Sequence, residues 1–195
     1  MSKNLNKDVD KYYFNLTKYF ELLDMNIKNI LSRDENDILT YDILDTDKSK
    51  TNKLLALKER QRQMKVGKIW QEVLGNYNEC INLKIGDKSG LDILCHTKKF
   101  AIELKNRTNT DNASSKKSNL DKLAKFKKKN PEYICIYANI NDYTEKKTLE
   151  GYIKKISHNG VELYHYVGYK FLKFILENNT DLIIDFVKNT IDKYT

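Results

Sequence analysis

Long apolar runs are absent from this 195-residue sequence. No stretch approaches the roughly 18 consecutive apolar residues that a membrane-spanning helix needs. The N-terminal segment MSKNLNKDVDKYY also lacks the apolar core that a signal peptide carries. Both absences argue against a membrane-bound or secreted protein, and we expect a cytoplasmic one.

Cysteine and histidine are scarce, with three residues of each. Cys80, Cys95 and Cys135 lie far apart among apolar neighbours, which favours buried free thiols over disulfides or a zinc site. The segment 157–160 (SHNG) hints at a His-Asn nuclease, but that chemistry needs further metal-binding histidines, and only two others remain. The chain has no G-x-x-x-x-G-K-S/T loop, which argues against ATP-driven activity.

Proline occurs once, in a chain rich in Lys, Asn, Ile and Tyr. AT-rich coding DNA produces such a composition by itself, so the net charge of +8 favours a polyanionic partner such as DNA without deciding for it. The hydrophobic fraction of 40% and the charged fraction of 32% are those of an ordinary globular protein. We expect a single domain over residues 1–195, divided into a helical N-terminal region (1–48), a catalytic α/β core (49–165) and C-terminal helices (166–195).

The spacing of apolar residues predicts helices in several parts of the chain. Their expected ranges are about 12–31, 49–74, 116–129, 169–177 and 180–194. Ser49 is the expected N-cap of the second helix, and Gly75-Asn76 is its expected stop. Pro131 forbids continuation of the third helix.

Strand patterns fill the middle of the chain. The expected ranges are 80–83, 91–96, 99–105, 132–140, 149–154 and 161–164. The nine-residue apolar and aromatic run at 132–140 is typical of a buried central strand. This order of elements predicts an α/β fold in which helices flank a mixed β-sheet.

The residues that carry chemistry lie on the second and third expected strands. Because side chains alternate along a strand, Ile102 and Leu104 would point into apolar packing, and Glu103 and Lys105 would share the opposite face. Asp92 stands at the start of the preceding strand. A hairpin between the two strands would bring Asp92 beside Glu103.

Two carboxylates and an amine suit the metal-assisted hydrolysis of a phosphodiester. Mg²⁺ prefers oxygen ligands, often one or two carboxylates together with water and phosphate oxygens. In this interpretation Asp92 and Glu103 bind the ion. Lys105 orients or deprotonates the attacking water and stabilises the charged transition state.

Asp92, a ten-residue gap and Glu103-x-Lys105 resemble the PD-(D/E)xK nuclease superfamily, which includes most type II restriction endonucleases. The resemblance spans about residues 50–140, with Leu91 in place of the proline that names the motif. The stretch 103–115 is similar to restriction enzymes that cut short GG/CC-type sites. The resemblance implies a restriction-endonuclease-like core, a mixed β-sheet flanked by helices, and Mg²⁺ as the cofactor.

The resemblance also implies what such an enzyme does. We expect a type II restriction endonuclease that hydrolyses both strands of a short palindromic-type DNA site and leaves 5′-phosphates. Such families often supply another acidic residue from the helix before the hairpin, and Glu72 is the matching position. A two-fold symmetric site favours a homodimer, formed through the N-terminal or the C-terminal helices, with a cognate DNA methyltransferase as genetic partner.

The segment after Lys105 is expected to be a long polar loop, residues 106–115, and to bind DNA. Asn and Arg side chains pair with base edges, whereas Ser, Lys and backbone amides mostly hold phosphates. The candidates are Asn106, Arg107, Asn109, Asn112, Ser114, Ser115, Lys116 and Lys117. In the helix that follows, Lys122, Lys125 and Lys129 share a face and suit phosphate contact, although a solvated face has the same pattern.

Two alternatives stay open. A repair or junction-resolving nuclease of the same superfamily would respond to DNA shape instead of sequence. A non-catalytic basic DNA-binding module would use Glu103 and Lys105 only as a surface ion pair.

Overall fold

The computed structural model describes residues 14–33, 43–83, 86–107, 112–141 and 150–195. These residues form a six-stranded sheet in the order β1-β2-β3-β4-β6-β5. The strands are β1 (Cys80–Asn82), β2 (Ile93–Cys95), β3 (Phe100–Arg107), β4 (Ile134–Asn141), β5 (Tyr152–His158) and β6 (Val161–Val167). The β3–β4 and β4–β6 pairs are parallel and the other pairs antiparallel, so the sheet is mixed.

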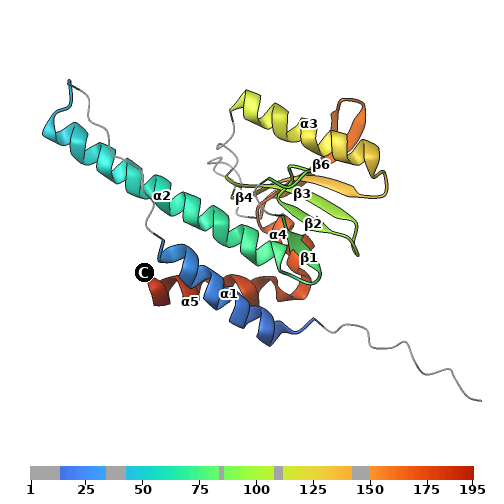
Figure 1. The fold of residues 1–195 in the computed structure, drawn as a ribbon, viewed down its shortest axis with the longest axis horizontal. Helices are drawn as coiled ribbons and strands as arrows, with labels where there is room; N and C mark the ends of the chain where they lie inside the picture. The colour runs from blue at the N-terminus through green and yellow to red at the C-terminus, as the bar shows by residue number, and fades with distance from the viewer. Residues whose placement is uncertain (1–13, 34–42, 84–85, 108–111, 142–149) are drawn as a thin grey trace, which may run out of the picture.

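Helices cover both faces of this sheet (Figure 1). They are α1 (Leu16–Leu31), α2 (Asp47–Gly75), α3 (Ala113–Lys129), α4 (Tyr169–Leu176) and α5 (Thr180–Tyr194), with a 3-10 turn, η1 (Glu177–Asn179), between the last two. α3 lies on one face, the other helices lie on the other side, and α2 extends well past the sheet (Figure 1). The predicted α/β fold, a restriction-endonuclease-like mixed sheet flanked by helices, is confirmed.

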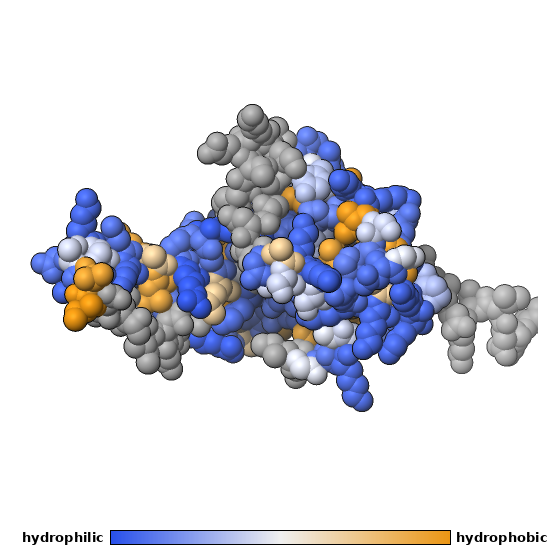
Figure 2. Space-filling view, turned by 90° about the horizontal axis from the view of Figure 1, so that it is seen from above, coloured by the Kyte–Doolittle hydropathy of each residue, from blue (hydrophilic) through white to orange (hydrophobic). Residues whose placement is uncertain are grey.

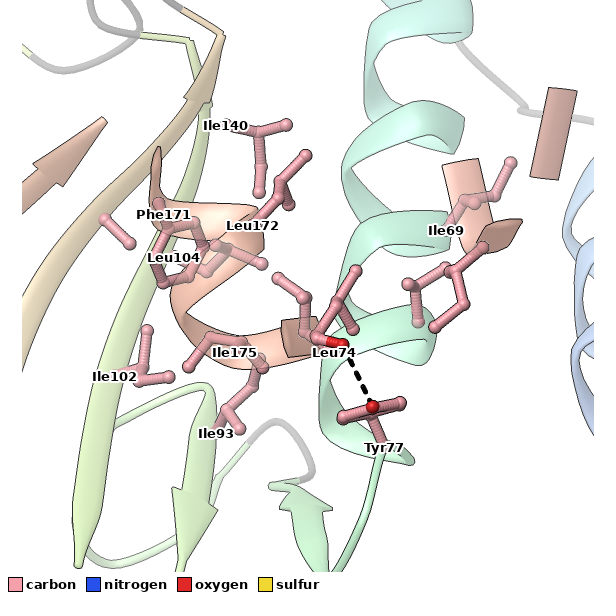
Figure 3. Close-up of a cluster of buried hydrophobic side chains, with 14 of the residues drawn as sticks. Ile69, Leu74, Tyr77, Ile93, Ile102, Leu104, Ile140, Phe171, Leu172 and Ile175 are labelled. Atoms are coloured by element: carbon pink, nitrogen blue, oxygen red, sulfur yellow. Dashed lines mark hydrogen bonds between the residues drawn. The ribbon is translucent and has the colours of Figure 1, made fainter. Parts of the chain in front are cut away.

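The larger core lies between the sheet and α1, α2, α4 and α5. Ile102 and Leu104 of β3 are buried there with Leu74 of α2 and Phe171 of α4 (Figure 3). The hydroxyl of Tyr77, just after α2, donates a hydrogen bond to the Leu176 carbonyl at 3.0 Å (Figure 3). This packing fixes α2 and β3 relative to each other and leaves alternate β3 side chains on the face that α3 covers.

The smaller core lies under α3. Leu123 and Ala124 of α3 pack on Ala101 of β3 and on Cys135 and Tyr137 of β4. Seen from the α3 side, the outer surface over this helix is mainly hydrophilic (Figure 2). α3 is therefore an amphipathic cover whose apolar side holds it against the sheet.

Several element boundaries differ from those the sequence predicts. α2 begins at Asp47, and Thr46 is its N-cap instead of Ser49, because the Thr46 hydroxyl accepts from the Ser49 N–H at 3.2 Å. Its end at Gly75-Asn76 is confirmed. β2 is shorter than expected, and Asp92 comes just before it. The expected strands near 149–154 and 161–164 are parts of a longer β5–β6 hairpin, although residue 149 lies outside the described residues.

The three cysteines are free thiols, as expected, with Cys95 and Cys135 buried and Cys80 half-buried. In the described parts of the chain, no helix combines the length and apolar character needed to span a membrane.

Candidate active site

Asp92 is fixed against β3 by its backbone and by its side chain. Its N–H donates to the Ile102 carbonyl at 3.1 Å, which continues the β2–β3 pairing by one residue. Its Oδ2 accepts from the Leu104 N–H at 2.7 Å. Its Oδ1 accepts from Nε2 of Gln71 on α2 at 3.2 Å. The predicted hairpin therefore places the Asp92 carboxylate along β3, level with Glu103.

Glu103 is a buried acid, with 3% of its surface exposed. Its Oε1 accepts from Nζ of Lys105 at 2.7 Å, and the Lys105 side chain is 23% exposed. Its Oε2 is buried and has no hydrogen-bond partner among the residues that the structure describes. A carboxylate oxygen in this state is costly, because burial removes water that nothing replaces.

The electrostatics of the two acids reflect this burial. Burial raises the pKa of Asp92 above its ordinary value, although the Leu104 N–H and the Lys105 charge oppose the rise. Burial also raises the pKa of Glu103, the nearby charge of Asp92 raises it further, and the Lys105 ammonium opposes both. The two carboxylates thus repel each other in a place where a cation would stabilise both.

These donors fit a magnesium ion. Mg²⁺ binds through one or two carboxylates and keeps several positions for water and phosphate oxygens. Asp92 and Glu103 supply two such oxygen donors, including the unpartnered Oε2 of Glu103. Within the described ranges no three Asp, Glu, His or Cys side chains gather into a fuller metal cage. The two acids could therefore supply only part of the coordination of Mg²⁺, and water and phosphate oxygens would supply the rest.

The raised pKa values predict how stability depends on pH without metal. An acid whose pKa is raised by folding contributes stability at low pH, and this contribution is lost as the pH rises through the folded pKa. Mg²⁺ binds only the ionised acids, so its stabilising effect should grow over the same range, above the ordinary carboxyl pKa of about 4. Urea unfolding from about pH 4 to pH 8, with and without MgCl₂, measures both trends. An Asp92→Asn/Glu103→Gln double variant with the same pH and Mg²⁺ dependence as wild type would contradict this account.

Glu72 lies in a different environment from the two acids. Its Oε2 accepts from Nδ2 of Asn26 at 2.8 Å and of Asn76 at 2.9 Å, and its Oε1 accepts from Nδ2 of Asn82 at 2.9 Å. These bonds join α1, α2 and β1 through one side chain. No hydrogen bond within the described residues joins Glu72 to Asp92 or Glu103, so its place in the catalytic centre stays a prediction.

Gln71 is the α2 residue that reaches Asp92, and the sequence analysis missed it. Neighbouring residues on a helix point about 100° apart, so the choice between positions 71 and 72 depends on how α2 is rotated against the sheet. That rotation is set by the packing of Val73 and Leu74, both fully buried. The helix was identifiable from sequence, but not its rotation.

Asn106 and Arg107 belong to β3 and not to a loop, which corrects the expectation for these two residues. Nδ2 of Asn106 donates to the Gln63 carbonyl of α2 at 3.3 Å. The Arg107 guanidinium pairs with Glu59 of α2 at 3.1 Å. Both side chains therefore connect the end of β3 to α2. Whether they also contact DNA stays a prediction.

The remaining DNA-binding candidates surround the start of α3, which begins at Ala113 instead of Lys116. Asn112 is its N-cap, with Oδ1 accepting from the Ser115 N–H at 2.7 Å. Asn112, Ser114, Ser115, Lys116 and Lys117 are all exposed. Asn109 lies outside the described residues. The first turns of α3 thus present hydroxyls and ammonium groups near the end of β3, as a phosphate-binding surface requires.

Three polar or aromatic residues on the same face of the sheet were also missed. Tyr137 pairs with Glu103 across β3 and β4, and His165 of β6 pairs with Tyr137. Asn139 is 1% exposed, its Nδ2 donates to the Arg107 carbonyl at 2.9 Å, and its Oδ1 lies 2.7 Å from Nε2 of His165. Dividing the run 132–140 into its two faces would have placed Tyr137 and Asn139 on the face of Glu103, opposite the residues of the larger core.

The whole chain was compared with known proteins. It matches the family model described as Eco47II restriction endonuclease over residues 4–183, a range that includes both acids, Lys105 and all of α2 and α3. No curated individual protein matches it significantly. The match confirms the resemblance to type II restriction endonucleases. The chain belongs to the Eco47II restriction endonuclease family, a family of nucleases.

Proposed function

We propose that the protein is a type II restriction endonuclease that requires Mg²⁺. It hydrolyses both strands of a short palindromic-type site in double-stranded DNA and leaves 5′-phosphates. The observation that carries this proposal is the pairing of half-buried Asp92 with buried Glu103, whose Oε1 bonds Lys105 and whose Oε2 has no partner among the described residues. Membership of a restriction endonuclease family supports the same conclusion.

The residues have distinct roles in this proposal. Asp92 and Glu103 bind Mg²⁺, which when bound supplies the charge that acidifies water and offsets the charge developing on the phosphate. Lys105 first releases its ammonium proton to solvent, and the neutral amine then orients the attacking water and accepts its proton. The water oxygen bonds to phosphorus while the bond from phosphorus to the 3′ oxygen breaks. The 3′ oxygen leaves as a hydroxyl after taking up a proton, and the phosphate stays on the 5′ end.

Two residues of α2 act on the site indirectly. Gln71 donates to Asp92 Oδ1 and so holds the carboxylate in one orientation. Glu72 joins three asparagine amides from α1, α2 and β1 and so holds the end of α2 in place. We assign Glu72 this positioning role. Its conversion to alanine would remove the carboxylate acceptor from three half-buried amides, of which only Asn76 would keep another acceptor, the backbone carbonyl of residue 72.

The DNA lies against the face that carries the acids. The exposed first turns of α3 bind phosphates, and Asn106, Arg107, Asn109 and Asn112 are the base-reading candidates. A two-fold symmetric site presents the same scissile bond on each strand, so two copies of the chain would act together as a homodimer. A cognate DNA methyltransferase would protect the host site. The enzyme would act in the cytoplasm, where the host DNA lies.

Two alternatives are less well supported. The DNA-binding module without catalysis requires a surface ion pair, but Glu103 is 3% exposed. A repair or junction-resolving nuclease could use the same acids, but the family match is to restriction endonucleases.

Digestion of plasmid DNA tests the proposal. Purified protein with MgCl₂ should give discrete fragments with 5′-phosphates, and the same protein with a chelator should give none. An Asp87→Asn variant should cut as wild type does. Asp87 is an acid of the neighbouring turn, and its carboxylate bonds Ser89. A smear without discrete fragments would favour a structure-directed nuclease, and intact plasmid under all conditions would contradict the enzymatic proposal.

A further inference from the structure

Lys122 reaches from α3 toward the turn that precedes Asp92. A Cβ atom added to Gly90 would lie 3.4 Å from Cδ and 3.6 Å from Cε of Lys122, so the lysine stem packs directly on this glycine. The Gly90 φ of +67° also favours glycine. Nζ of Lys122 donates to Oδ1 of Asn119 at 3.3 Å, and Asn119 is 7% exposed. The lysine is therefore held along its length instead of extending into solvent.

The Lys122 stem packs on Gly90, which stands two residues before Asp92, so the Lys122 side chain lies beside the acid pair. Its charge lowers the pKa of Asp92 and of Glu103, in the same direction as the charge of Lys105. Lys105 comes from β3 and Lys122 from α3, so the acid pair has a cation on each of two sides. Lys125, one turn further along α3, lines the same pocket of about 320 Å³ beside Gly90 but is exposed.

Lys122 is not required to neutralise the two carboxylates. Lys105 already bonds Glu103, and a bound divalent ion would neutralise both carboxylates. With such an ion present, Lys122 adds positive charge at the point where a substrate phosphate approaches. Cations in that place are effective in phosphoryl transfer when they contact the oxygens on which charge accumulates.

We propose that Lys122 is a second catalytic cation, which binds a non-bridging oxygen of the scissile DNA phosphate and stabilises its charge in the transition state. Asn119 and Gly90 position it. This inference rests on the proposed function and names a further residue of the same site. The test must distinguish this catalytic role from a simpler one, in which Lys122 only binds a neighbouring phosphate of the DNA backbone.

Lys122→Gln should change metal binding and cleavage in opposite directions. Removing a positive charge beside the acids should tighten Mg²⁺ binding to the DNA-free protein by a factor of about 2 to 10. The single-turnover cleavage rate should fall by about 10²-fold or more. DNA affinity in metal-free buffer with a chelator should fall by less than about fivefold. Thermal-shift titration with MgCl₂, quenched-flow cleavage and fluorescence anisotropy measure the three quantities.

Lys128→Gln is the matched control, because it removes the same charge from an exposed position of the same helix. It should leave Mg²⁺ affinity and the single-turnover rate unchanged. Lys122→Arg should restore the wild-type Mg²⁺ affinity and part of the cleavage rate. Lys122→Met keeps the stem against Gly90 and serves in the same assays if Lys122→Gln folds poorly.

Two results would overturn the assignment. In one, Lys122→Gln cuts at the wild-type rate. In the other, it only weakens DNA binding and leaves Mg²⁺ affinity unchanged, which identifies a backbone anchor. If Glu103→Gln is inactive, either result rejects the role of Lys122 and leaves the proposed nuclease function intact. A fully active Glu103→Gln would instead remove the proposed function itself.

Discussion

Glu103→Gln should abolish cleavage while DNA binding persists. Glutamine has nearly the same shape as glutamate but lacks its charge, and amide oxygens are weaker Mg²⁺ ligands in such a site. Loss of several kcal/mol of metal-derived stabilisation corresponds to a rate decrease of about 10³-fold or more. The Mg²⁺-induced rise in melting temperature should disappear as well, because a neutral amide replaces the buried carboxylate that would bind the ion.

Glu162→Gln provides the control for this prediction. Glu162 also pairs with a lysine, Lys155 at 3.1 Å, but both side chains are exposed on the β5–β6 hairpin. Exposed ion pairs of this kind contribute little, so this variant should cleave and bind Mg²⁺ like wild type. The measurements are single-turnover cleavage, anisotropy with labelled DNA in chelator, and thermal melts. Equal cleavage by the two variants would show that Glu103 has no special role.

Lys105→Met should give the second-largest effect. General acid–base catalysis typically contributes about 10²- to 10⁴-fold, and Lys105 is the amine bonded to Glu103 at 2.7 Å. Cleavage should fall by a factor in this range while DNA affinity stays within about threefold, because one phosphate contact at most is removed. A non-catalytic DNA-binding protein would show no such separation between cleavage and binding.

The pH dependence of Lys105→Met provides an independent readout. The Lys105 ammonium lowers the pKa of Glu103, so its removal lets that pKa rise further. Glu103 then stays protonated to a higher pH, and the acid limb of Mg²⁺ binding should move to higher pH than in wild type. Lys155→Met is the matched control and should leave this limb in place. An unshifted limb in Lys105→Met would contradict the pairing of the two side chains in solution.

The central hairpin was predictable because its signals are local. Alternation within the segment 100–105 already assigns Ile102 and Leu104 to one face and Glu103 and Lys105 to the other, and the structure buries the first two in the large core. The ten residues between Asp92 and Glu103 span one turn and the rest of two short strands, so few other arrangements were open. Helices and the central parallel strand were recognisable for the same reason.

The features of the site that were not predicted depend on how elements distant in the sequence pack together. The rotation of α2 decides that Gln71, and not Glu72, contacts Asp92. The pairing of β3 with β4 decides that Asn106 and Arg107 continue the strand, since Nδ2 of Asn141 holds the Asn106 carbonyl at 3.1 Å. Polar composition alone suggested a loop there. The chain carries no local signal for a pairing partner that is more than 30 residues away.

The position of Lys122 could not be predicted from the sequence either. In sequence it is one of several lysines on a helix face, indistinguishable from Lys125 or Lys129. Only the packing of α3 over the sheet brings its stem onto Gly90, two residues before Asp92. The sequence gives the charge of this helix, and the fold decides which lysine faces the site.

The central claim is that Asp92 and Glu103 hold one divalent ion together. The most direct test is a crystal structure of the protein grown with Mn²⁺, which takes oxygen ligands as Mg²⁺ does and has a measurable anomalous signal. We expect one anomalous peak in contact with an oxygen of Asp92 and with Oε2 of Glu103, and its loss in Glu103→Gln. A peak held by other residues, or a filled site in Glu103→Gln, would show that the two acids do not share the ion.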